Sequence, residues 1–132
     1  MTIIHLKLIL LIFATTLSFY MIANMHPDYV LGQTPDLTGV WASNDGGTYY
    51  IKQIENDILW FGKSNADPPS FANVFHGTLK DSSITGIWAD VPLGSNQNHG
   101  TLTLQIQNDG SLSKTAMTGG FFGSNFYKLQ IP

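Results

Sequence analysis

The sequence predicts an all-β protein that folds as one antiparallel up-and-down barrel of about eight strands. A Thr-Gly-x-Trp-Ala segment occurs at 38–42 and again at 85–89, and each copy leads through a Gly-Thr pair into an alternating strand and an Asn-Asp turn. Such an internal repeat indicates two copies of one unit, here a β-meander. No segment after residue 32 has the 3.6-residue apolar period of a helix. A closed barrel removes exposed sheet edges, which favours it over the alternative, a two-sheet β-sandwich.

Clusters of turn residues separate the strands along the chain. Asn, Asp and Gly tolerate the positive φ of tight turns, and Pro lacks a backbone donor, so these residues indicate strand ends. They predict connections at residues 43–47, 55–57, 64–70, 81–83, 91–99, 108–110 and 118–123. The predicted strands between them cover residues 37–42, 48–54, 58–63, 71–80, 84–90, 101–107, 111–117 and 125–131.

Alternation of apolar and polar residues assigns the faces of some strands. In segment 101–107, the two leucines and the isoleucine form one row that we expect to face inward. Segment 58–63 is apolar on both faces, with Ile58 and Trp60 on one and Leu59 and Phe61 on the other. This pattern predicts either a contact between protomers of an oligomer or loops folded over the outside of the barrel.

The first 32 residues are predicted to be a signal peptide, or an N-terminal membrane anchor, plus a linker; residues 33–132 form the barrel domain. Lys7 precedes an apolar run at residues 8–23, which is shorter than the roughly 20 residues of a membrane-spanning helix. This is typical of a secretory signal. We therefore expect an extracytoplasmic protein, either secreted or anchored at the cell surface, with membrane contact only through residues 8–23 if the leader is uncleaved. The chain has no cysteine, so no disulfide framework is expected.

The charge of the chain argues against nucleic acid as a partner. The formal net charge is −3, and lysine supplies every positive side chain apart from histidine, since the sequence contains no arginine. Arginine usually provides the bidentate contacts to phosphate, and nucleic-acid-binding proteins carry basic patches. No phosphate-binding loop, nucleophile elbow or spacing typical of metal ligands is found.

The Gly39-x-Trp41 motif on the first strand of an eight-stranded meander resembles the calycin group, which includes lipocalins, fatty-acid-binding proteins and avidin-type proteins. In topology the resemblance covers most of the chain after residue 32, whereas the sequence motif spans three residues. Lipocalins typically place a basic residue late in the chain over this tryptophan, and the last strand here offers only Lys128. The biotin-binding pattern of avidins is not recognisable. The resemblance therefore implies an architecture and identifies no ligand.

Aromatic residues beside uncharged polar loops predict a binding site at the open end of the barrel. Eleven residues separate Trp88 from Gly100, whereas five separate Trp41 from Gly47, and extra loop length often carries function. We expect the ligand to contact the aromatic residues Trp41, Tyr49, Phe75 and Trp88 and the rim residues Asn44, Asp45, Asp90 and His99. The structural alternative is that the tryptophans fill the core and that the segment 44–47 is only a turn. The segment 119–123 is predicted to bend the chain and to plug the barrel end with its two phenylalanines.

These observations predict an exported, non-catalytic binding protein, lipocalin-like, that holds a small molecule or a glycan and needs no cofactor or metal. The alternative is a structural or interaction module of the cell envelope with a solid core. A small enzyme is a third class, and it would need His76 or His99 close to a carboxylate.

Overall fold

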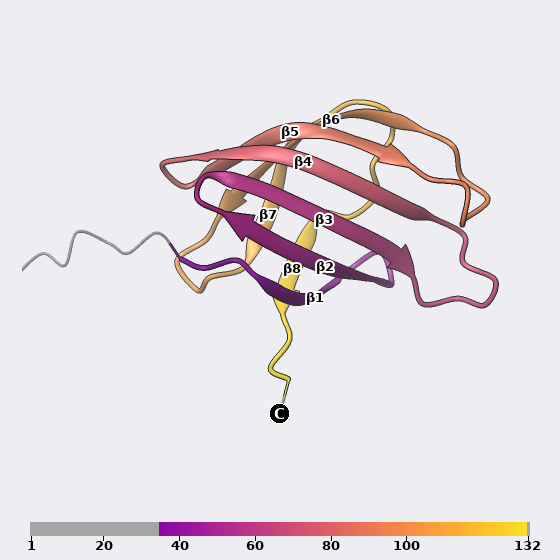
Figure 1. The fold of residues 1–132 in the computed structure, drawn as a ribbon, viewed down its shortest axis with the longest axis horizontal. Coiled ribbons are helices and arrows are strands. Elements are labelled where there is room, and N and C mark those ends of the chain that lie inside the picture. Colours follow the sequence, from indigo (N-terminus) through magenta and orange to yellow (C-terminus); the bar gives the residue numbers. More distant parts are fainter. Residues whose placement is uncertain (1–34, 132) are drawn as a thin grey trace, which may run out of the picture. The chain divides into compact units, whose positions relative to one another are not determined.

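Eight antiparallel strands close into a barrel in the computed structural model, which describes residues 35–131 (Figure 1). Each strand pairs with the next along the chain, and β1 also pairs with β8. Within residues 35–131, no helix is long and apolar enough to cross a membrane. The strands are β1 (Gly39–Ser43), β2 (Gly47–Ile54), β3 (Asp57–Ser64), β4 (Ala72–Lys80), β5 (Ser83–Asp90), β6 (His99–Ile106), β7 (Leu112–Met117) and β8 (Asn125–Lys128).

The predicted all-β barrel is confirmed, and the sandwich alternative is wrong because the sheet closes. All eight predicted strands exist, but the first starts later and the last ends earlier than expected. Before Gly39, the side chain of Gln53 replaces the backbone ladder by accepting a hydrogen bond from the Leu37 N–H. After Lys128, a single backbone bond from Leu129 N–H to Val40 O remains. The predicted signal or anchor segment lies outside the described residues.

Aromatic side chains fill the interior of the barrel. Trp60 stacks on Phe75 with ring centroids 4.3 Å apart, and Tyr49 meets Trp60 edge-on at 5.4 Å. Phe126 packs edge-on against Tyr49 at 5.0 Å. All of these rings are buried, as is the predicted inward row of segment 101–107 at Leu102 and Leu104. Edge-to-face and offset pairs of this kind add to the stability that burial supplies.

The tryptophans of the two motif copies are both buried, but their indoles bond to different parts of the chain. Trp41 Nε1 donates to Leu37 O at 2.9 Å, just ahead of β1, and Trp88 Nε1 donates to Thr118 O at 3.1 Å, just after β7. The sequence repeat therefore gives two similar strands in two different surroundings. Each tryptophan fills part of the core, as the structural alternative expected.

The connections divide between the two ends of the barrel. Four of them, which we call the mouth, meet at one end: residues 44–46, 65–71, 91–98 and 118–124. The connections at 65–71 and 91–98 lie on the same side of the barrel in Figure 1. The remaining connections and both ends of the described chain lie away from the mouth.

Strand β3 has an exposed apolar outer face, as its sequence suggested. Leu59 is exposed, and so are Val74 and Ile87 on the neighbouring strands β4 and β5. Within residues 35–131, no loop covers these side chains. The apolar outer face is therefore present, and the contact between protomers stays a prediction.

We expect Trp41→Ala to lower the free energy of unfolding by about 3–5 kcal/mol, the usual cost of truncating a buried aromatic residue. The variant leaves a cavity and removes the donor to Leu37 O. Trp41→Phe, which retains most of the ring, should cost clearly less. Urea unfolding followed by circular dichroism measures both values, and equal stability of wild type and Trp41→Ala would contradict the packed position of Trp41.

Candidate functional site

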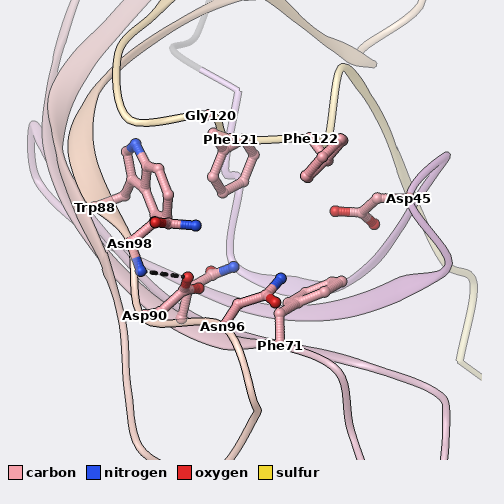
Figure 2. Close-up of a pocket in the computed structure, with 10 residues that line it drawn as sticks. Asp45, Phe71, Trp88, Asp90, Asn96, Asn98, Gly120, Phe121 and Phe122 are labelled. Atoms are coloured by element: carbon pink, nitrogen blue, oxygen red, sulfur yellow. Dashed lines mark hydrogen bonds between the residues drawn. The ribbon is translucent and has the colours of Figure 1, made fainter.

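A pocket opens at the mouth, and all four connections or the strand ends beside them contribute to it (Figure 2). The pocket is small, with a volume of about 30 Å³, room for roughly two water molecules. In Figure 2, Trp88 and Asp90 lie on one side of the pocket and Asp45 on the other. The lining residues are Asp45, Phe71, Asn73, Trp88, Asp90, Asn96, Asn98, Gly120, Phe121 and Phe122.

Asp45 is held in place by the turn that contains it. Gly46 has a φ of 77°, the left-handed region that glycine adopts readily, and this lets the chain reverse between β1 and β2. One carboxylate oxygen of Asp45 accepts the Gly47 N–H at 2.9 Å, and the other accepts the Tyr49 hydroxyl at 2.5 Å. Two donors thus fix the orientation of a carboxylate at the rim of the pocket.

Buried polar groups connect this carboxylate to the core. Asn73, on β4, is 3% exposed, and its side-chain oxygen accepts the Trp60 indole N–H at 2.9 Å. Burial raises the pKa of Tyr49 well above its ordinary value, the negative charge of Asp45 adds to the rise, and the Asn73 amide acts in the opposite direction. The Tyr49 phenol therefore stays protonated and keeps donating to Asp45.

Asp90 closes the long connection between β5 and β6. Its backbone N–H donates to Asn98 O at 2.7 Å, and its Oδ2 accepts the Asn98 N–H at 2.9 Å, the dashed line in Figure 2. Among residues 35–131, no donor reaches the second oxygen, Oδ1. Asp90 therefore brings a carboxylate with a free acceptor position to the pocket, beside the amides of Asn96 and Asn98.

Aromatic side chains form the other walls of the pocket. Phe121 is buried and meets Trp88 edge-on at 5.1 Å, whereas the next residue, Phe122, is 81% exposed. Lys114 Nζ donates to Phe121 O at 2.6 Å and so ties this loop to β7. Partial burial lowers the pKa of Lys114, an effect that the charge of Asp45 opposes. The loop thus places one phenylalanine under the pocket and one at its open edge.

Three residues that the sequence predicted for the site, Asp45, Trp88 and Asp90, line the pocket. Tyr49 lies beneath it and acts on it through Asp45. Asn44 is in the same turn, but its side-chain oxygen accepts the Ser124 and Asn125 N–H groups, so it joins the first turn to the loop before β8.

The other three predicted residues lie away from the pocket lining. Phe75 is a core residue stacked on Trp60. His99 begins β6 and pairs with Ala89, with its side chain exposed. Trp41 borders a separate hollow of about 360 Å³ at the opposite end of the barrel, together with Lys128.

Lys128 is the basic residue of the last strand that lies beside the Gly39-x-Trp41 motif. It pairs with Trp41 across β1 and β8, and its side chain lies so close to Gly39 that a Cβ there would come within 2.7 Å of Lys128 Cε. Its Nζ donates to Asp36 O at 2.9 Å. The glycine of the Gly-x-Trp motif thus makes room for a lysine stem beside the tryptophan.

The sequence argument did not select several lining residues as site residues. Asn73 carries a recognisable signal, because on β4 it shares the inward face of Phe75 and Leu79, where a polar side chain needs a buried partner. Phe71 was predicted as the first residue of the fourth strand, but it lies in the connection just before β4. Phe121 closes the barrel end as predicted, but Phe122 is 81% exposed, so the prediction that both phenylalanines plug the barrel is wrong for Phe122.

The chemistry of the pocket combines fixed carboxylates, primary amides and aromatic faces. Within residues 35–131, no three His, Cys, Asp or Glu side chains gather as metal ligands would. Carboxylates accept hydrogen bonds and amides both donate and accept, so together they suit hydroxyl groups, which also do both. Comparison of the chain with protein-family models, with curated proteins and with solved structures finds no match.

We expect the stability of the protein to fall above about pH 10, the pKa of tyrosine in an unfolded chain, partly because of Tyr49. Since folding raises the pKa of Tyr49, its contribution is fully present below the unfolded pKa and is lost as the pH rises above it. Tyr49→Phe lacks this contribution, so its urea midpoint should fall less steeply between about pH 9 and 11. Identical slopes in the two proteins would show that the phenol is not buried.

Proposed function

We propose that the protein is an exported, non-catalytic binding protein of calycin-like type whose mouth holds a small hydroxylated molecule, such as a sugar unit of a glycan. The single observation that carries the proposal is the convergence of all four mouth connections on one pocket with fixed carboxylates, amides and aromatic faces. Ligand sites commonly combine apolar walls with a few positioned polar groups.

The packing of the barrel argues for a ligand at the mouth and against one inside. The rings of Tyr49, Trp60, Phe75 and Phe126 occupy the space where a hollow barrel would hold a lipophilic molecule. The pocket, with a volume of about 30 Å³, accepts a hydroxyl or hydroxymethyl group but not a whole ring. A ligand would therefore enter with one edge, while its remainder lies against the exposed Phe122.

The polar groups favour a neutral, hydroxylated ligand. Asp90 Oδ1 is a free acceptor, and the amides of Asn96 and Asn98 add donors and acceptors at the same edge. The apolar face of a sugar ring suits the exposed ring of Phe122 at the edge of the pocket. An anionic ligand would meet two carboxylates here, with Lys114 engaged by the Phe121 carbonyl.

A structural or interaction module is the second candidate, and the burial of Trp41 and Trp88 in a filled core favours it. In that case the mouth would be only the closed end of a rigid scaffold. The small-enzyme class rests on a single pair, His76 Nε2 with Asp57 Oδ1 at 3.1 Å. Both side chains are more than half exposed on the outer wall, and neither lines the mouth pocket.

We expect monosaccharides and short oligosaccharides to shift the NMR signals of the Trp88 indole and of the Asn96 and Asn98 side-chain amides. Asp90→Asn preserves an acceptor for the Asn98 N–H but replaces the free carboxylate oxygen, so affinity should fall about tenfold or more, as for loss of a charged hydrogen bond. The matched control is Trp41→Phe at the opposite end, which should bind like the wild type. Shifts confined to other residues, or no binding at millimolar sugar, would overturn the proposal.

A further inference from the structure

The outer wall of the barrel carries an apolar surface in which the exposed His76 lies between Leu59 and Ile87, and the exposed Lys52 borders Leu59. We call it the outer apolar face, and it consists of Tyr50, Leu59, Phe61, Val74, Ile87 and Ala89 on strands β2 to β5. Tyr50, Phe61, Val74 and Ala89 are successive cross-strand partners, and the Tyr50 and Phe61 rings stack at 6.5 Å. Ile87 is 67% exposed. Contiguous exposed apolar surface of this kind usually indicates an interaction site.

The outer apolar face is not part of the core, because the same strands already point other apolar residues inward. The inward neighbours of these residues, such as Trp60 and Phe75, already fill the core. A shallow groove of about 350 Å³ runs between Leu59, Val74 and Ile87, and His76 stands within the face beside it. Closure of the barrel leaves no free strand edge, so a partner must pack on the face rather than extend the sheet.

The order of outward side chains on β3 identifies the partner. From one end of the strand to the other they are Asp57, Leu59, Phe61 and Lys63: acidic, apolar, apolar, basic. A two-fold axis in the plane of the contact, crossing β3 at Trp60, makes the β3 strands of two copies run antiparallel. Leu59 of each copy then faces Phe61 of the other, and Asp57 of each faces Lys63 of the other. The pattern is self-complementary, as a two-fold symmetric interface requires.

We propose that two copies of this chain form a symmetric dimer through the outer apolar face, with β3 against β3 in antiparallel orientation. The apolar rows supply burial, and the two Asp57–Lys63 contacts set the register. Among residues 35–131, Lys63 makes no ion pair, whereas Asp57 pairs with the exposed His76, a contact that Lys63 of a second copy would share or replace. The face lies on the wall of the barrel, so dimerisation leaves both mouths open and makes the protein bivalent.

Charge reversal tests the register on the exported protein by sedimentation velocity. Asp57→Lys or Lys63→Asp alone places like charges together at both symmetric contacts and should raise the dissociation constant roughly tenfold or more. The double variant D57K/K63D restores opposite charges and should restore the dimer. Loss of the exposed pair with His76 is common to D57K and the double variant, so it cannot account for the recovery.

Thiol crosslinking gives an independent readout, because the chain has no cysteine of its own. Positions 57 and 63 lie about 20 Å apart on one strand, whereas sheets packed face to face lie about 10 Å apart, which exceeds the reach of a disulfide but suits a short bismaleimide. D57C/K63C should therefore form a covalent dimer with a bismaleimide of about 8 Å, while D57C and K63C alone should stay monomeric because like positions lie about 20 Å apart along the strands across the axis.

The possible results distinguish a second copy of the chain from a lipid surface as the partner of the outer apolar face. A concentration-dependent dimer that the single reversals weaken and the double variant restores supports the proposal. A monomer at all concentrations up to about 100 μM, where weak dimers are populated, overturns it. Co-sedimentation of a monomer with phosphatidylcholine vesicles would assign the face to lipid instead, and crosslinking of single D57C to itself would overturn the antiparallel register.

Discussion

The hydrogen bond from the buried Tyr49 hydroxyl to Asp45 joins the core of this protein to its mouth. A buried phenol needs a partner, and here the partner is a carboxylate on the first turn, so the ring cannot pack without placing that carboxylate. The ring itself meets Trp60, Phe71, Phe121 and Phe126, which come from four other parts of the chain. One side chain thereby fixes the centre of the barrel and the position of a charge at its rim.

Aromatic side chains fill the inside of the barrel, and the polar side chains of the pocket lie at its mouth. Asn73 satisfies the Trp60 indole inside the wall, so the core contains aromatic rings without orphaned polar atoms among the described residues. The polar groups of the pocket lie where the four mouth connections meet. Lys114 holds the connection 118–124 beside the pocket through its hydrogen bond to Phe121 O. The outer apolar face on β2 to β5 is then surplus to folding, which is why an interaction between copies can use it.

The sequence predicts the architecture well because strand alternation, turn residues and the duplicated motif are local signals. All eight strands are recovered, but some of their ends differ from the prediction. At Leu37 and after Lys128, Gln53 and one backbone bond to Val40 replace the ladder, and β6 starts at His99 instead of residue 101. The site was predictable only in part. Asp45 and Asp90 sit at strand ends that the turns reveal, whereas Trp41 and Trp88 look alike in sequence and face different ends because barrel closure and the β7–β8 loop surround them differently. The surroundings of each tryptophan depend on contacts between residues far apart in the sequence, which a single sequence does not reveal.

The most direct test of a filled barrel is hydrogen exchange of the three tryptophan indole protons, followed by NMR in deuterated buffer. Each indole donates to a protein acceptor, but only Trp60 donates to a side chain inside the wall. If the interior is solid, the Trp60 indole proton exchanges only through global unfolding, at a rate that tracks stability as urea is added. If it exchanges within minutes and independently of stability, water enters the barrel, the core is hollow, and the ligand site belongs inside rather than at the mouth.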